Sequence, residues 1–171
     1  MTARTAAAAT LGGLGGGLIV GALARLDMRV IALVRGDLAN FSIFGTVGIL
    51  ITFVLMSLAL ALSYAWWSRG RGIAFWALPG LALFLAVLFI TPLRQELAAP
   101  SELLLFAPVA LVLGPFAAGL TALASRGLPV AGSRLGYRLL AIPAAGSLIA
   151  LALLLLVGAL QTAGVIGVPA D

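Results

Sequence analysis

The chain consists mainly of long apolar stretches without charge, separated by shorter segments that hold all of its charged residues. Crossing the roughly 30 Å hydrocarbon core of a bilayer takes about 20 helical residues, at about 1.5 Å per residue. Five uncharged stretches approach or exceed that length: residues 5–24, 41–67, 73–91, 103–124 and 139–160. Strands of a membrane barrel alternate apolar and polar side chains over about ten residues, whereas these stretches are apolar on every side. The pattern predicts one all-α domain over residues 1–171, a polytopic transmembrane helical bundle with five spans.

Polar residues and prolines indicate where these helices begin and how they connect. The hydroxyls of Ser42 and Ser101 are suited to cap the second and fourth helices. Segment 69–72, which alternates Arg and Gly, predicts a tight turn, so helices two and three should form an antiparallel pair. Four prolines inside the last three spans could curve a helix or shape a cavity or gate: Pro79, Pro108, Pro115 and Pro143.

The first apolar stretch has a second interpretation, as a secretory signal peptide. Arg4 precedes it, and Ala-Leu-Ala at residues 22–24 would be an acceptable cleavage site. Its 20 residues are long for a signal core, however, and six glycines make that core weak. We expect a retained first span, with cleavage as the alternative.

Composition agrees with a membrane protein and removes several chemistries. Hydrophobic residues make up 63% of the chain and charged residues 9%, and the mean hydropathy is +1.24. A soluble domain of this size carries about a quarter charged residues, so the expected solvent is the lipid bilayer. The chain has neither Cys nor His, which excludes disulfides, thiolate chemistry, His-ligated haem and imidazole bases. No catalytic residue, metal site or cofactor is expected.

The arginines predict the orientation of the five spans. Six arginines and no acid fall on the side of the amino terminus: Arg4, Arg69, Arg71, Arg126, Arg134 and Arg138. The other side holds four arginines and all five acids. The positive-inside rule then places the amino terminus in the cytoplasm and the carboxyl terminus outside. Every Trp and Tyr lies near the same cytoplasmic boundary: Tyr64, Trp66, Trp67, Trp76 and Tyr137. Anionic lipid is the partner expected at the cytoplasmic arginines, and no nucleic acid is expected.

The first span carries two overlapping ladders of glycine, each with a spacing of four residues. Gly12 and Gly16 form one ladder, and Gly13, Gly17 and Gly21 form the other. Such ladders remove side chains from a helix face and let a second backbone approach closely. The ladders predict either a face for self-association through the first helix or an internal groove that receives another helix of the same chain.

Segment 25–36 has an amphipathic pattern. On a helical wheel its apolar arc contains Leu26, Val30, Ile31, Leu33 and Val34, with Asp27 inside it. Three arginines lie on the opposite arc: Arg25, Arg29 and Arg35. The pattern predicts a short helix in the membrane interface, and the alternative is that the first span simply continues. In either case, Asp27 should pair with one of these arginines or with Arg94.

Charged residues from two predicted outer loops form a candidate binding cluster, here called the outer-face cluster: Arg25, Asp27, Arg29, Arg35, Arg94 and Glu96. Arginine forks bind phosphate and carboxylate groups, so a lipid head group or an anionic peptide could bind there. The alternative is a set of solvated rim charges.

The predicted spans contain no charged residue, although ion-coupled transporters usually place one within the membrane. Their mid-membrane polar residues are few and small: Thr46, Thr52, Ser57, Ser63, Thr121 and Ser147. These hydroxyls favour hydrogen bonds between helices, and a passive pore for a neutral solute stays open. No pair of acids has the spacing of a metal site, and the glycine run lacks the lysine of a phosphate-binding loop.

Two short motifs stand at the ends of the first two apolar stretches. The first stretch is followed by Ala-Arg-Leu-Asp-Met-Arg at 24–29, and the second opens with Asn-Phe-Ser-Ile-Phe-Gly-Thr at 40–46. Over residues 12–60 the chain resembles uncharacterised bacterial multi-spanning membrane proteins with a glycine-rich first helix. The resemblance implies no known activity. It singles out residues at the outer end of helices one and two: Arg25, Arg29, Phe41, Ser42, Gly45 and Thr46. A chain rich in Ala, Leu, Gly and Arg without Lys fits a GC-rich bacterial genome, and therefore a bacterial inner membrane.

Three functions remain on these grounds. The first is a non-enzymatic subunit or accessory factor in the assembly of a larger membrane complex, because catalytic residue types are absent and the glycine ladders suit helix contact. The second is a transporter or channel for a small solute or lipid. The third is an enzyme that binds lipid head groups at the outer-face cluster.

Overall fold

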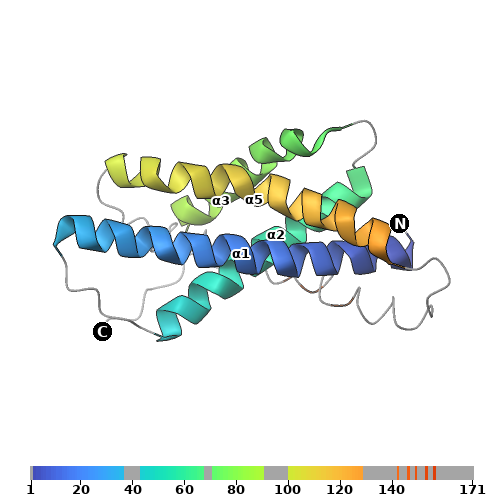
Figure 1. The fold of residues 1–171 in the computed structure, drawn as a ribbon, viewed down its shortest axis with the longest axis horizontal. Helices are drawn as coiled ribbons and strands as arrows, with labels where there is room; N and C mark the ends of the chain where they lie inside the picture. The colour runs from blue at the N-terminus through green and yellow to red at the C-terminus, as the bar shows by residue number, and fades with distance from the viewer. Residues whose placement is uncertain are drawn as a thin grey trace.

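The computed structural model describes residues 2–36, 43–67, 71–90 and 100–128, together with the isolated helical positions 142, 146, 149, 153 and 156. The described part is helical and contains no strand. Its elements are α1 (Ala3–Arg35), α2 (Ile43–Trp67), the 3-10 helix η1 (Ile73–Trp76), α3 (Ala77–Ile90) and α5 (Pro100–Gly127). The structure therefore confirms the helical bundle (Figure 1).

Helix α1 is much longer than the predicted first span. The hydroxyl of Thr2 accepts a hydrogen bond from the Thr5 backbone N–H at 3.2 Å and caps its first turn. The helix ends at Gly36, which has a left-handed φ of 74°. Of the two interpretations of segment 25–36, the structure has the continuous one: α1 runs through this segment without a break, and no separate interfacial helix forms. The segment lacks Gly and Pro before residue 36, so nothing in it interrupts the helix.

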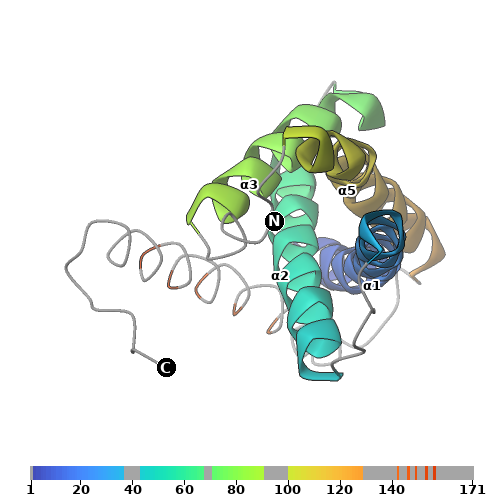
Figure 2. The same ribbon diagram turned by 90° about the vertical axis from the view of Figure 1, so that its left-hand side faces the viewer.

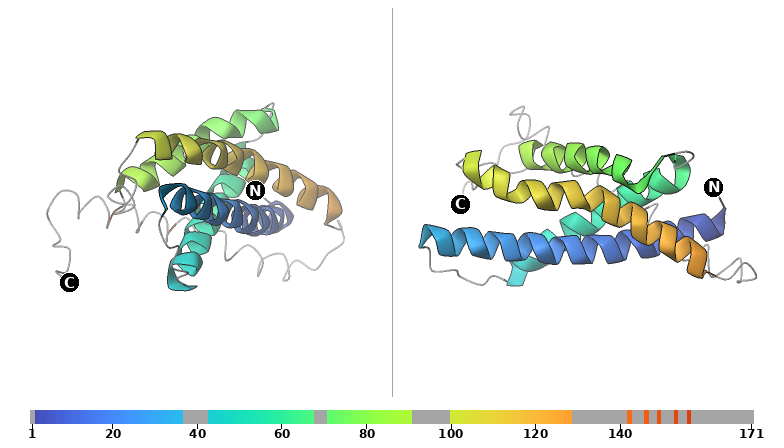
Figure 3. Two further views of the ribbon diagram at one scale, coloured as in Figure 1. Left: turned by 60° about the vertical axis from the view of Figure 1, so that its left-hand side comes forward. Right: turned by 45° about the horizontal axis from the view of Figure 1, so that its top comes forward.

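Helix α1 packs between two partners. It contacts α2 along one side and α5 along another, and Figure 2 shows α1 and α3 on opposite sides of the α2–α5 pair. Arg4 joins the start of α1 to the end of α5, since its Nη2 donates to the carbonyls of Ser125 at 2.6 Å and Leu128 at 2.8 Å. The two helices therefore run antiparallel, as Figure 3 shows. Cleavage after the first stretch would remove the helix that α2 and α5 pack against.

Helix α3 packs mainly against α5 and only slightly against α2, so the predicted pairing of the second and third helices is wrong in its main contact. Glycines explain the choice of partner. A β-carbon added at Gly80 would lie 2.7 Å from the backbone N of Gly114. One added at Gly114 would collide with the carbonyl O of Trp76 in η1. Backbones at that separation leave no room for a side chain, and α5 supplies the matching glycine.

Three helices in the described part are long and apolar enough to cross a membrane: Ala3–Leu33, Gly45–Trp67 and Phe106–Gly127. A fourth, Ile73–Leu88, is apolar but shorter. Stretch 139–160 lies outside the described residues apart from isolated positions, and Pro143 lies outside as well. The helix α5 continues through Pro108 and Pro115.

The two predicted serine caps have different outcomes. Ser42 lies outside the described residues. Ser101 is not a cap, because α5 already begins at Pro100, one residue earlier. A proline suits the first position of a helix, since its fixed φ matches the helical value and its missing N–H would have no helical acceptor there.

Candidate functional site

Glycines of α1 make the half of the bundle near Arg4 closely packed. A β-carbon added at Gly13 would lie 2.7 Å from Leu58 Cα, and one added at Gly17 would lie 2.8 Å from the Phe53 carbonyl O. At Gly21 the nearest atom would be Leu50 Cδ2, at 3.1 Å. This ladder therefore lies against α2 of the same chain.

The second ladder lies against a different helix. A β-carbon at Gly12 would lie 2.6 Å from Thr121 Cα in α5. One at Gly16 would lie 2.9 Å from Ser57 Oγ in α2 and 3.3 Å from Ala117 Cα in α5. Both ladders are thus occupied by helices of the same chain. This arrangement matches the internal-groove interpretation of the glycine pattern.

Hydroxyl groups in the bundle bond mainly to their own helices. Thr121 donates to the Ala117 carbonyl at 2.6 Å, and Thr10 donates to the Ala6 carbonyl at 3.1 Å. Thr52 and Ser63 likewise donate to carbonyls four residues earlier. These bonds satisfy the four hydroxyls within their own helices, whereas the buried Oγ of Ser57 has no hydrogen-bond partner among the described residues.

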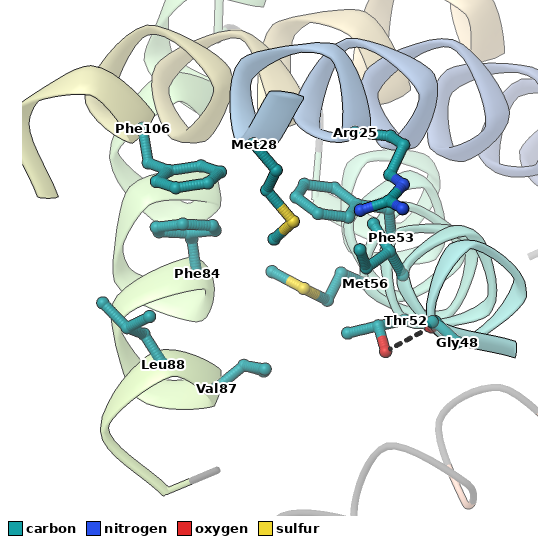
Figure 4. A pocket seen from close by; sticks show the side chains of 12 residues that line it. Arg25, Met28, Gly48, Thr52, Phe53, Met56, Phe84, Val87, Leu88 and Phe106 are labelled. Atoms are coloured by element: carbon teal, nitrogen blue, oxygen red, sulfur yellow. Dashed lines mark hydrogen bonds between the residues drawn. The ribbon is translucent and has the colours of Figure 1, made fainter. Parts of the chain in front are cut away.

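A cavity of about 350 Å³ lies between α1, α2, α3 and α5, near the end of the bundle where α2 begins (Figure 4). Among the described residues, twelve line it: Arg25, Met28, Gly45, Gly48, Ile49, Thr52, Phe53, Met56, Phe84, Val87, Leu88 and Phe106. Most of these side chains are apolar. The cavity is partly open rather than enclosed. It is large enough for a small ligand, because such sites measure about 300–1,000 Å³.

Three phenylalanines from three helices form one wall of this cavity. The ring centroid of Phe84 lies 6.2 Å from that of Phe53 and 6.3 Å from that of Phe106. The rings of Phe84 and Phe106 are nearly parallel, with an interplanar angle of 28°. Figure 4 shows Met28 and Met56 between the Phe84–Phe106 pair on one side and Phe53 and Arg25 on the other. Thioether side chains are flexible, so this surface can adapt to an apolar chain of variable shape.

Arg25 gives the cavity its charge. Of the described lining residues, only Arg25 is ionisable. Its Nε donates to the hydroxyl of Thr46 at 3.0 Å, and the contact is partly buried. The bond joins the far part of α1 to the start of α2, as the sequence pattern predicts for these two motifs. The guanidinium is therefore held at the wall of an otherwise apolar cavity.

The outer-face cluster is placed only in part. Arg25, Asp27 and Arg29 lie on α1, whereas the side chain of Arg35 and all of Arg94 and Glu96 lie outside the described residues. Arg29 is exposed and does not line the cavity. The predicted pairing of Asp27 with Arg25 or Arg29 is absent among the described side chains. Asp27 is two positions from each, and residues two apart on a helix do not face each other.

Aromatic residues surround an arginine at the opposite end of the bundle. The guanidinium carbon of Arg71 lies 3.7 Å from the ring centroid of Trp67 and 4.8 Å from that of Phe75. Tyr64 and Trp76 pack edge to face, with centroids 5.6 Å apart. Cation–π contacts of this kind hold an arginine against aromatic rings where a bilayer meets water. Tyr137 lies outside the described residues.

The phenylalanines of the cavity could not be recognised in the sequence. Phe53, Phe84 and Phe106 belong to three stretches in which almost every position is apolar, and nothing in a uniformly apolar helix marks a lining residue. The Arg25 and Thr46 motifs were the one available signal. Among the described residues, no group of three His, Cys, Asp or Glu could hold a metal ion.

Comparison of the chain with protein-family models found no match, and comparisons with curated proteins and with solved structures found none either. The resemblance to uncharacterised bacterial membrane proteins therefore stays a prediction, and the site has to be interpreted from its own geometry.

Proposed function

We propose that this protein is a non-enzymatic integral membrane protein that binds a lipid-like molecule in the cavity between α1, α2, α3 and α5. The observation that carries the proposal is the cavity itself, about 350 Å³ in volume and lined mainly by apolar side chains, with Arg25 as the one ionisable group among the described lining residues. Apolar walls with few polar groups are typical of sites that bind an apolar body and orient it by one end.

The surrounding membrane favours an amphiphile over a water-soluble ligand. The helices that line the cavity are apolar on their outer faces too, with Val47 and Ile51 of α2 about half exposed. Such faces are stable in a bilayer, where lipid chains are the molecules present at highest concentration. A ligand of the cavity can therefore reach it from the lipid phase.

We also propose five spans in a bacterial inner membrane, with the amino terminus in the cytoplasm. Helices α1, α2 and α5 are long and apolar enough to cross a bilayer, which supports three of these spans. The hydrogen bonds from Arg4 to Ser125 and Leu128 support placing the start of the first span and the end of the fourth span on the same side of the membrane. Cysteines introduced at Ser68 and Ala98 test the orientation in a chain that has no other cysteine. An impermeant thiol reagent should label Ala98→Cys in intact cells, and labelling of Ser68→Cys alone would invert the orientation.

The first and third functions predicted from the sequence, an assembly subunit and a head-group enzyme, receive less support from the geometry. A role as subunit or assembly factor of a larger complex was motivated by the glycine ladders, and both ladders are occupied inside the chain. An enzyme that acts on head groups needs a base or a nucleophile beside the arginine, and the described cavity residues supply none. Both functions stay predictions.

Filling the cavity tests the proposed function. Gly48 lines the cavity, and a β-carbon there would meet no atom within 4 Å, so Gly48→Leu should fold and occupy the space. Gly119 of α5 also has open space around it but does not line the cavity, so Gly119→Leu is the matched control. Native mass spectrometry of protein released from lipid nanodiscs should show a bound lipid-like molecule on the wild type and on Gly119→Leu, but not on Gly48→Leu. Equal retention by all three proteins would contradict the proposal.

A further inference from the structure

We infer that the ligand of this cavity is a single-chain amphiphile with an anionic head, a carboxylate or a phosphate, held at Arg25. The inference rests on the proposed function and names the class of molecule that the site selects.

The charge of Arg25 selects the head group. The planar fork of its guanidinium matches the two oxygens of a carboxylate or phosphate. The 3.0 Å bond from Nε to Thr46 holds the plane of this fork at the cavity wall. In apolar surroundings, attraction between opposite charges is much stronger than in water, so an anion gains most from this position.

The shape of the cavity selects one chain. Figure 4 places Arg25 on one side of the cavity and Leu88 and Phe106 on the other, with Met28 and Met56 between them. The head group of an amphiphile would therefore contact one wall of the cavity, and its tail the other. A volume of about 350 Å³ lies at the lower end of the range for sites that bind small ligands, about 300–1,000 Å³. It suits one medium-length acyl chain better than the two chains of a membrane phospholipid.

Photolabelling of the full-length protein in nanodiscs of neutral phosphatidylcholine tests this inference. The probes are diazirine-bearing dodecanoic acid and its neutral counterpart, diazirine-bearing dodecanol, with adducts mapped by mass spectrometry. The carboxylate probe should label cavity residues of the wild type at least about tenfold more efficiently than the alcohol, as expected for a hydrogen bond to a charged group. Dodecyl phosphate should compete with this labelling, whereas inorganic phosphate at the same concentration should not.

Two variants and one control locate the selectivity. Arg25→Gln should reduce carboxylate labelling by about tenfold and leave alcohol labelling unchanged. Arg29→Gln removes the same charge from an exposed position one turn further along α1, and it should change neither probe. Thr46→Val keeps the charge but removes the acceptor that orients the guanidinium, so its loss of carboxylate labelling should be smaller. This variant also keeps the inference testable if Arg25→Gln does not fold.

The possible outcomes separate the inference from the proposed function. Equal labelling of the wild-type cavity by both probes, or unchanged carboxylate labelling in a folded Arg25→Gln protein, overturns the anionic selectivity and leaves a neutral lipid site. Competition by inorganic phosphate as strong as by dodecyl phosphate overturns the amphiphile and indicates a free-anion site. No labelling of cavity residues by either probe, or crosslinks only to residues 129–171 of the same chain, overturns the proposed function itself.

Discussion

The two halves of the bundle use glycine in opposite ways. Near Arg4, the glycines of α1 let the backbones of α2 and α5 approach so closely that an added β-carbon would collide. In the half that contains Arg25, Gly48 lies beside a cavity, and an added β-carbon would meet nothing within 4 Å. Close backbone contact stabilises the first half through dispersion, because lipid offers no hydrophobic drive for helix association. The second half keeps space that a ligand can fill.

The largest expected effect is that of Gly17→Leu in the closely packed half. A side chain there would force the backbone of α2 away from α1 at Val54. Overpacking typically costs about 1–3 kcal/mol, and we expect the upper end of that range because the obstacle is backbone. The thermal stability of the purified protein in detergent should therefore drop sharply. Gly119→Leu is the control, and it should stay within a fraction of a kilocalorie of the wild type or rise slightly. Unchanged stability of Gly17→Leu would contradict the close packing of α1 and α2.

The next effect concerns the contact that closes this half at its end. Arg4→Ala removes three hydrogen bonds to the carbonyls of Ser125 and Leu128, and hydrogen bonds from a charged group contribute about 1.5–3 kcal/mol. We expect a loss of about 2 kcal/mol in unfolding by sodium dodecyl sulfate in mixed micelles. Arg126→Ala removes an exposed arginine from the same helix end, so it should cost only a few tenths of a kcal/mol. Equal losses for the two variants would show that only the helix dipole matters.

In the cavity half, the same type of substitution should have the opposite sign. Gly48→Leu replaces a poor helix former by a good one without a collision, which stabilises a helix by about 0.5–1 kcal/mol. The midpoint of unfolding should therefore rise in ligand-free protein. A fall as large as that of Gly17→Leu would show that the cavity is already closed, and the contrast between the halves would disappear.

The smallest effect is expected at Thr52, which lines the cavity. Its hydroxyl donates to the carbonyl of Gly48 in its own helix at 2.9 Å, so it has no donor left for a ligand. Thr52→Val should leave both stability and dodecanoate labelling unchanged, within about 0.5 kcal/mol and about twofold. Loss of labelling would show that the ligand is bound by this hydroxyl as well as by Arg25.

Some of the site could be predicted from local residues. The motifs around Arg25 and Thr46 flank two helices, and their meeting follows when the chain between them folds back. The four-residue spacing of the α1 glycines likewise predicts a face for close helix contact. Asp27 shows the limit of such reasoning. Its place on the apolar arc of the wheel suggested an arginine partner. Arg25 and Arg29 are not that partner, because residues two positions apart point in different directions on a helix. The side chain of Arg35 and all of Arg94 lie outside the described residues.

The amino-acid sequence by itself determined the helical class, the apolar stretches and the absence of thiol and imidazole chemistry, because these depend only on residue type and local order. It also determined which face of α1 carries no side chains. Only the tertiary structure decided that α2 takes the Gly13 ladder, that α5 takes the Gly12 ladder, and that α3 packs on α5. The cavity beside Arg25 was decided at that level too. The physical reason is that helices apolar on every side have no preferred neighbour by hydrophobicity, so shape complementarity between backbones selects the partner and leaves space where it fails.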